Sequence, residues 1–184
     1  GSGKSVTTQS FLPLLLDGNK QPSRLDPFGS RSRKMIDYIF GENPDVSQKT
    51  SYIFLEYKRK YTEEYITTGI GFEANFDNDK VDSWHFLIKN KRVGKDFDLF
   101  KYQLDENGEK VMVPLSQKEL ESYVDREKCG YVKEKQKDYA ELVNNYIFKF
   151  ESLEDYLDMV NLVVRIRTPK LSNDLGPNVI YQIL

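Results

Sequence analysis

The spacing of apolar residues changes along the chain and divides it into segments. Residues 4–16 carry apolar side chains at helical spacing and are followed by Gly18, which predicts a helix with Pro13 in its last turn. Residues 19–33 are polar and rich in turn-forming residues, so they predict a loop. Residues 34–40 predict a second, short helix.

From residue 51 the apolar period shortens to two, the spacing of a half-buried strand. The segments that match a strand pattern are residues 51–58, 65–72, 83–88, 99–104 and 110–113. Asn107 and Gly108 lie between the last two segments, and this dipeptide favours the tight turn of a β-hairpin. We therefore expect antiparallel strands across this part of the chain.

The pattern returns to helical spacing after Pro114, and we expect no strand beyond that residue. Ser116 and Glu119 form a capping-box pattern, which satisfies two exposed backbone donors at the start of a helix. Residues 136–148 and 153–165 predict two further helices.

These elements predict an α/β fold in three consecutive parts. Residues 1–50 hold a partial phosphate-binding motif, a helix and a basic loop, residues 51–115 hold antiparallel strands, and residues 116–184 are helical. The chain has 184 residues, of which 39% are hydrophobic, and this is enough for one compact domain with a core.

Composition and charge exclude several classes of protein. No apolar run approaches the roughly 18 residues that a membrane helix needs, so we expect no membrane partner. The formal net charge of -2 argues against a surface that binds nucleic acid over its whole extent, but it leaves room for local basic patches. The single cysteine, Cys129, excludes an internal disulfide, and the first residues lack a signal-peptide pattern; both observations favour the cytoplasm.

The chain opens with a short motif of known chemistry, Gly1-Ser2-Gly3-Lys4-Ser5, directly before the first predicted helix. This is the second half of the Walker A pattern, G-x-x-x-x-G-K-[ST]. The glycines let backbone N–H groups surround phosphate oxygens, and the helix N-terminus adds the positive end of its dipole. The lysine reaches the β- and γ-phosphates, and the serine hydroxyl holds Mg²⁺.

This reading assigns Lys4 the catalytic role, Gly1 through Val6 the binding of ATP, and Ser5 the binding of Mg²⁺. The first glycine of the pattern would lie five positions before Gly3, ahead of the first residue of this sequence. The alternative is that Gly-Ser is the remnant of a cleaved tag. The context favours the phosphate-binding loop, because Gly-Lys-Ser continues directly into a helix-forming segment.

The segment from Gly1 to Gly41 closely resembles the start of the SMC-like ATPases of Wadjet plasmid-defence systems, the JetC type. These proteins are relatives of the condensin-like MukB and MksB proteins. The resemblance continues more weakly along the rest of the chain, in residues 51–59 and 66–74, in the predicted strand that contains Trp84, and in residues 139–150 and 162–172.

The resemblance implies a P-loop ATPase head of the ABC or SMC type, which a long coiled coil divides in sequence. This chain is expected to be its N-terminal lobe, truncated at both ends, with a mixed sheet, an antiparallel subdomain, and helices that lead toward the coiled coil. The whole protein would couple ATP hydrolysis to DNA translocation or loop extrusion in defence against plasmids. The implied partners are the second head lobe, a second SMC-like subunit in a dimer, kleisin-type and accessory subunits, and double-stranded DNA.

Three clusters of basic residues are candidates for contact with phosphate or DNA. The first lies in residues 24–34, where Arg31 is the best candidate ligand, since related heads use an arginine in this region and a guanidinium is planar and always charged. Residues 89–95 and 165–170 hold the second and third clusters. The alternative for each cluster is a solvated basic surface, and we expect the first cluster to carry the functional charge.

Other reaction types have little support in the residues. His85 is the only histidine and Cys129 the only cysteine, so the sequence offers no ligand set for zinc and no hydrolase triad. Trp84 is expected in the core. Two alternative functions remain: another P-loop enzyme such as a small kinase, and a non-enzymatic interaction domain in which the Gly-Ser-Gly-Lys-Ser sequence is incidental.

Overall fold

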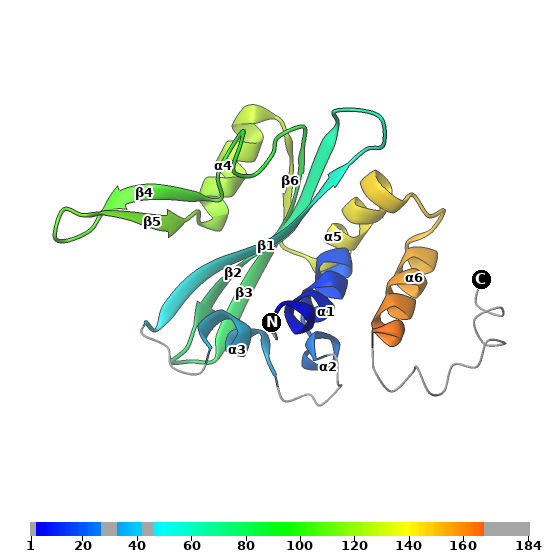
Figure 1. Ribbon diagram of the computed structural model, residues 1–184, viewed down its shortest axis with the longest axis horizontal. Helices are drawn as coiled ribbons and strands as arrows, with labels where there is room; N and C mark the ends of the chain where they lie inside the picture. Colours follow the sequence, from blue (N-terminus) through cyan, green and yellow to red (C-terminus); the bar gives the residue numbers. More distant parts are fainter. Residues whose placement is uncertain (1–2, 27–32, 42–45, 168–184) are drawn as a thin grey trace.

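A computed structural model gives the fold of the chain and describes residues 3–26, 33–41 and 46–167, with side chains from residue 9 onward (Figure 1). Its helices are α1 (Gly3–Asp17), α2 (Pro22–Leu25), α3 (Met35–Phe40), α4 (Gln117–Glu127), α5 (Gln136–Val143), the π-helical turn η1 (Asn144–Phe148) and α6 (Leu153–Ile166). Its strands are β1 (Gln48–Lys58), β2 (Tyr65–Asn75), β3 (Lys80–Lys89), β4 (Phe100–Leu104), β5 (Lys110–Pro114) and β6 (Gly130–Lys133). Within these ranges, no helix has the length and apolar character needed to cross a membrane.

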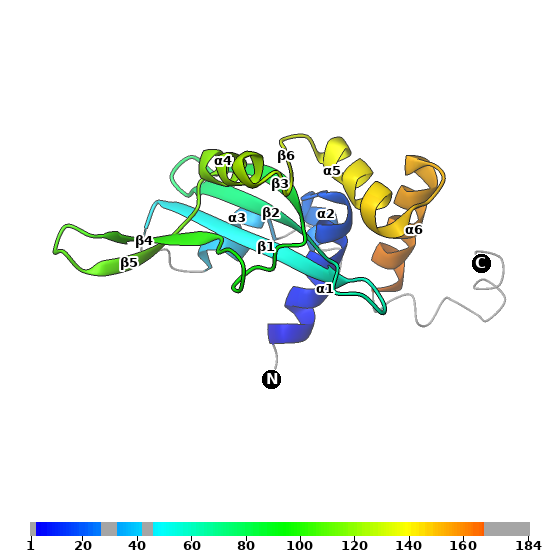
Figure 2. The ribbon, with the colours of Figure 1, turned by 90° about the horizontal axis from the view of Figure 1, so that it is seen from above.

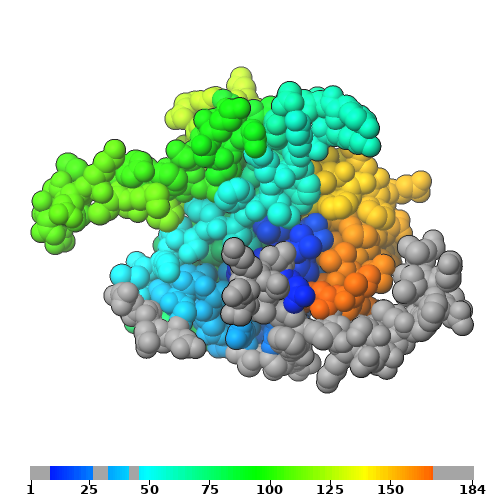
Figure 3. Space-filling model, viewed as in Figure 1, coloured from blue at the N-terminus to red at the C-terminus, as the bar shows by residue number. Residues whose placement is uncertain are grey.

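The strands form a four-stranded sheet in the order β1-β2-β3-β6 and a separate two-stranded hairpin, β4-β5. The hairpin projects from the body of the molecule as an arm (Figures 1 and 3). The pairings among β1 to β6 are all antiparallel, so the expected α/β class is confirmed but the expected mixed sheet is wrong for this part of the chain. The connections explain this result, because the short turns after β1 and β2 can join only antiparallel neighbours.

Each face of the four-stranded sheet carries its own hydrophobic core. Alternate residues of β2, such as Ile70 and Phe72, contribute to the core that the helices α1, α3, α5 and α6 cover. Alternate residues of β3, such as Trp84 and Phe86, contribute to the opposite core, together with α4 and the segment before β4. The sheet therefore separates the first helix from α4 (Figure 2).

Two glycines of β2 make room for the aromatic residues of the second core. Gly71 pairs with Trp84 across the ladder, and Gly69 pairs with Phe86. A Cβ atom at Gly71 would lie 2.2 Å from Cε2 of Trp84, and one at Gly69 would lie 2.4 Å from Cζ of Phe86. The aromatic rings therefore lie flat over the strand, and Trp84 is only 2% exposed, as expected for a core residue.

Most predicted elements are confirmed, including α1, both strands of the hairpin and the capping box of Ser116 with Glu119. Besides the mixed sheet, two predictions of single segments are wrong. The expected loop contains α2, which begins at Pro22 because proline suits the first position of a helix. The region expected to be wholly helical contains β6, where Gly130 lies so close to β3 that a Cβ atom would be 1.9 Å from the Leu87 carbonyl oxygen.

Replacing Gly71 by alanine should destabilise the fold, because the new methyl group overlaps the Trp84 ring. We expect the free energy of unfolding to fall by about 1 to 3 kcal/mol in chemical denaturation. The smaller ring of Trp84→Phe should relieve the overlap, so the cost of Gly71→Ala should shrink in that background. An equal loss of unfolding free energy in the two backgrounds would show that the cost of Gly71→Ala does not come from overlap with the Trp84 ring.

Candidate functional site

The residues of the expected phosphate-binding loop lie at and before the start of α1. Gly1, Ser2 and Arg31 fall outside the described residues. The backbone of Gly3–Val6 forms the first turn of α1, as expected, while the side chains of this turn fall outside the described part. The described part of the site consists of the backbone of the first turn of α1 and of the contacts that hold this helix in place.

The start of α1 has the backbone features of an anion site. The first turn of a helix leaves its N–H groups without helical partners and carries the positive end of the dipole. The first turn of α1 contains no acidic residue that would compete for these groups. Glycine, lysine and serine at this turn fit the phosphates and Mg²⁺ of a nucleotide, because serine offers the hard oxygen that Mg²⁺ prefers.

The middle of α1 contains a gap in its hydrogen bonding, and a distant residue closes it. Pro13 has no N–H group, so the carbonyl of Gln9 lacks its helical donor. The guanidinium of Arg167, at the end of α6, donates to this carbonyl over 2.7 Å. A second nitrogen of Arg167 donates to the carbonyl of Arg24. Arg167 belongs to the third basic cluster, which the sequence offered as a candidate for contact with phosphate or DNA. In the structure it binds the backbone of α1 and of α2 instead.

The last carbonyls of α1 also have specific partners. The N–H of Gly18 donates to the Leu14 carbonyl over 2.7 Å, which the φ angle of +75° at this glycine permits. The hydroxyl of Tyr139 on α5 donates to the Leu15 carbonyl at 2.6 Å. The hydroxyl of Tyr156 on α6 donates to the Leu16 carbonyl at the same distance. Because both tyrosines are fully buried, no water replaces these bonds.

The end of α1 carries a buried ion pair with α2. Asp17 and Arg24 form a salt bridge, and their side chains are only 5% and 12% exposed. Burial raises the pKa of Asp17, and the positive charge of Arg24 opposes this change. Arg24 also donates to Asn161 on α6 over 2.8 Å. Arg24 was grouped with the basic loop in the sequence, but the structure uses it to join α1, α2 and α6.

His85 supports Tyr139 from the sheet. Its ring stacks on the Tyr139 ring with 5.0 Å between centroids, and its Nδ1 lies 3.2 Å from the Lys133 carbonyl oxygen. Burial lowers the pKa of His85, so the ring is neutral at pH 7 and Nδ1 donates to that carbonyl. Within the described residues, no group of three or more His, Cys, Asp and Glu side chains is placed to hold a metal ion.

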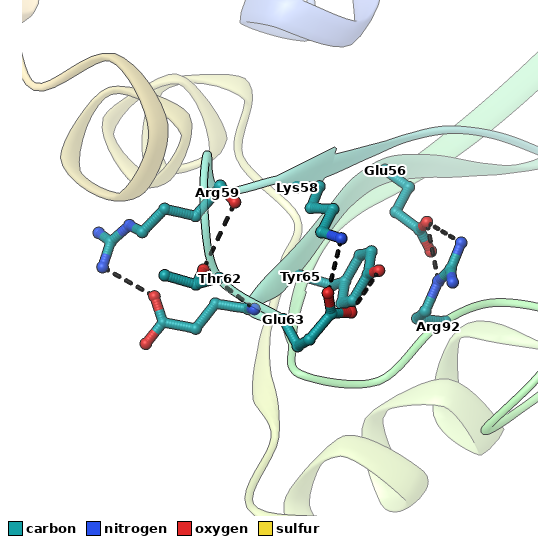
Figure 4. Close-up of polar contacts among 8 residues, drawn as sticks. Glu56, Lys58, Arg59, Thr62, Glu63, Tyr65 and Arg92 are labelled. Carbon is teal, nitrogen blue, oxygen red and sulfur yellow. Dashed lines mark hydrogen bonds and ion pairs between the residues drawn. The ribbon is translucent and has the colours of Figure 1, made fainter.

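Two cations of the second basic cluster, Lys91 and Arg92, form ion pairs. Arg92 donates to Glu56 over 2.7 Å and lies over the Tyr65 ring, 4.3 Å from its centroid (Figure 4). Lys91 lies 3.5 Å from Glu127. In the first cluster, Lys34 pairs with Asp79 at 2.6 Å. These contacts account for several of the cations that the sequence presented as free.

Comparisons with protein-family models, with curated proteins and with solved structures give no significant match for this chain.

Replacing Tyr139 or Tyr156 by phenylalanine should destabilise the fold. Each change leaves a buried carbonyl of α1 without its donor, at a cost of about 1 to 3 kcal/mol in the free energy of unfolding. The matched control is Tyr131→Phe, which removes an exposed hydroxyl contact with Tyr146 and should cost about 0.5 kcal/mol or less. Denaturant unfolding measures all three variants, and equal costs would mean that the buried hydroxyls do not hold α1.

Proposed function

We propose that this chain is the ATP-binding N-terminal lobe of an SMC-like, DNA-associated ATPase of the Wadjet type. The observation that carries the proposal is the position of Gly3-Lys4-Ser5 in the first turn of α1. A helix start with this sequence offers backbone donors and a lysine to the phosphates, and a hydroxyl to Mg²⁺. The antiparallel sheet and the helices that cover it are compatible with such a lobe.

In this proposal each residue of the turn has one task. Backbone N–H groups from Gly1 to Val6 bind the phosphates of ATP, and Lys4 neutralises the charge that develops on the β- and γ-phosphates. Ser5 binds the Mg²⁺ that bridges the same phosphates. Arg31 is a further candidate ligand for phosphate or DNA. Hydrolysis needs groups from a second lobe and a second head, so the chain alone should show no turnover.

The free edge of β1 supports the part of the proposal in which the head has a second lobe. β1 is an outer strand of the sheet, so one row of its backbone groups has no partner strand in the described residues. An apolar groove lies between this strand and α1, lined by Phe11, Leu12, Leu15, Tyr52, Ile53, Phe54 and Leu55. An open edge beside an apolar groove is a surface that another part of a protein can extend.

The β4-β5 arm favours a second candidate function, that of a protein-interaction module. Three large apolar residues share one face of the arm and are more than half exposed, namely Tyr102, Leu104 and Met112. Isolated hairpins are marginally stable in water, and an exposed apolar face on one is typical of a contact surface. The two functions are compatible, because the head of such an ATPase also binds accessory subunits.

The proposal is tested in the two-lobed head to which we assign the chain. Lys4→Ala should abolish the binding of ATP with Mg²⁺ in calorimetry, because the phosphate charge loses its main counter-ion. The melting temperature without ligand should stay within the error of the wild type. The control Lys60→Ala removes an exposed lysine of the β1–β2 turn and should bind ATP normally. Unaltered ATP affinity in Lys4→Ala would refute the assignment.

A further inference from the structure

A cleft opens at the end of the sheet, where the β1–β2 turn, the end of β3 and η1 meet. Its volume is about 370 Å³, and it is lined by Tyr57, Lys58, Arg59, Glu64, Ile66, Lys89, Asn90, Tyr146, Ile147 and Lys149. Figure 3 shows the turn after β1 (teal) beside the segment that contains α5 and η1 (yellow). No residue of α1 lines the cleft, so it is a separate site from the proposed nucleotide site.

The cleft carries positive charge that the chain itself does not neutralise. Lys89 lies over the rings of Tyr131 and Tyr146, at 5.5 and 5.4 Å from their centroids, and has no carboxylate partner among the described residues. Lys149 also forms no ion pair within those residues. Arg59 pairs with Glu64 at 2.8 Å, but both side chains are more than half exposed, so this pair is weak.

A fourth cation of the cleft, Lys58, is held in an ion pair that is exposed like that of Arg59. The ammonium group of Lys58 pairs with Glu63 at 2.7 Å and lies near the Tyr65 ring (Figure 4). Since Lys58 pairs with Glu63 and Arg59 pairs with Glu64, the lining cations without an ion-pair partner among the described residues are Lys89 and Lys149. This local excess of positive charge contrasts with the formal net charge of -2 of the whole chain, so it is a specific feature of the cleft.

The backbone around the cleft holds these residues in defined positions. Asn144 is buried, and its side chain accepts from the Phe150 N–H over 2.8 Å and donates to the Phe150 carbonyl over 3.1 Å. These two hydrogen bonds close the turn after η1. In that turn Lys149 has a φ angle of +60° and donates its N–H to the Asn144 carbonyl. Single π-helical turns of this type occur frequently at functional sites.

We propose that this cleft binds a phosphate group of a ligand. The two lysines without an ion-pair partner suit a multiply charged oxyanion, since ammonium groups bind phosphate as point charges. Arg59 lies beside them in a weak, exposed pair with Glu64, so its guanidinium can add a directed fork. The volume lies within the range of small-ligand sites, and Tyr146 and Asn90 supply polar groups around it. The same chemistry suits the phosphates of a small molecule and those of a nucleic acid backbone.

The test uses the full chain in a Lys4→Ala background, so that the first turn of α1 does not contribute to binding. The probes are tripolyphosphate in calorimetry and a short DNA duplex in fluorescence anisotropy. Lys89→Met and Lys149→Ala should each weaken binding about tenfold, because each removes one charge-assisted contact. Methionine at position 89 keeps the apolar contact with the tyrosine rings, so the variant should fold.

The matched control is Lys60→Ala, which removes a lysine of the same turn that does not line the cleft. Weakened binding of tripolyphosphate in the cleft variants supports a small phosphate ligand, and weakened binding of the duplex alone supports a nucleic acid backbone. The proposal is overturned if the Lys4→Ala parent binds neither probe at low ionic strength. It is also overturned if Lys60→Ala weakens binding as much as the cleft variants do.

Discussion

The position of α1 in the fold depends on hydrogen-bond donors that later segments of the chain supply to its carbonyl groups. Pro13 leaves the Gln9 carbonyl free, and the end of the helix leaves those of Leu15 and Leu16 free. Their donors are Arg167, Tyr139 and Tyr156, which lie 124 to 158 residues away in the sequence. The bonds to Leu15 and Leu16 are buried, and a buried carbonyl without a donor costs free energy, so α5 and α6 stabilise α1 in this position.

This dependence has a consequence for the start of α1. The helix is held at its middle and at its end, between the sheet and the two later helices, so the direction of its first turn is determined by the core. A phosphate site at that turn would be preorganised, and binding would require little ordering of the protein. The Asp17–Arg24 pair adds a further constraint, because removing either partner leaves a buried charge.

Local signals allowed much of the secondary structure to be predicted from the sequence. The helix of α1, the β4-β5 hairpin at Asn107-Gly108 and the cap at Ser116 each depend on neighbouring residues alone. β6 was missed because it has four residues and pairs with β3 through the close approach of Gly130, a contact between distant segments. The hydrogen bond from the Tyr139 hydroxyl to the Leu15 carbonyl could not be predicted either, since only the fold brings these two groups together.

The candidate sites differ in the same way. The phosphate-binding motif was predicted because its residues are consecutive, and its function stays a prediction. The cleft at the end of the sheet was not predicted, because Lys89 and Lys149 are brought together by the sheet and η1. Nothing in the sequence distinguished Lys89 from Arg92, yet the structure pairs Arg92 with Glu56 and leaves Lys89 facing two tyrosine rings.

The most direct test of the central claim is a crystal structure of the two-lobed head with a non-hydrolysable ATP analogue and Mg²⁺. The account predicts that the β- and γ-phosphates lie at the first turn of α1, with the Lys4 ammonium in hydrogen-bond contact and the Ser5 hydroxyl on the metal ion. A nucleotide bound elsewhere, with the first turn of α1 empty at saturating ligand, would contradict it.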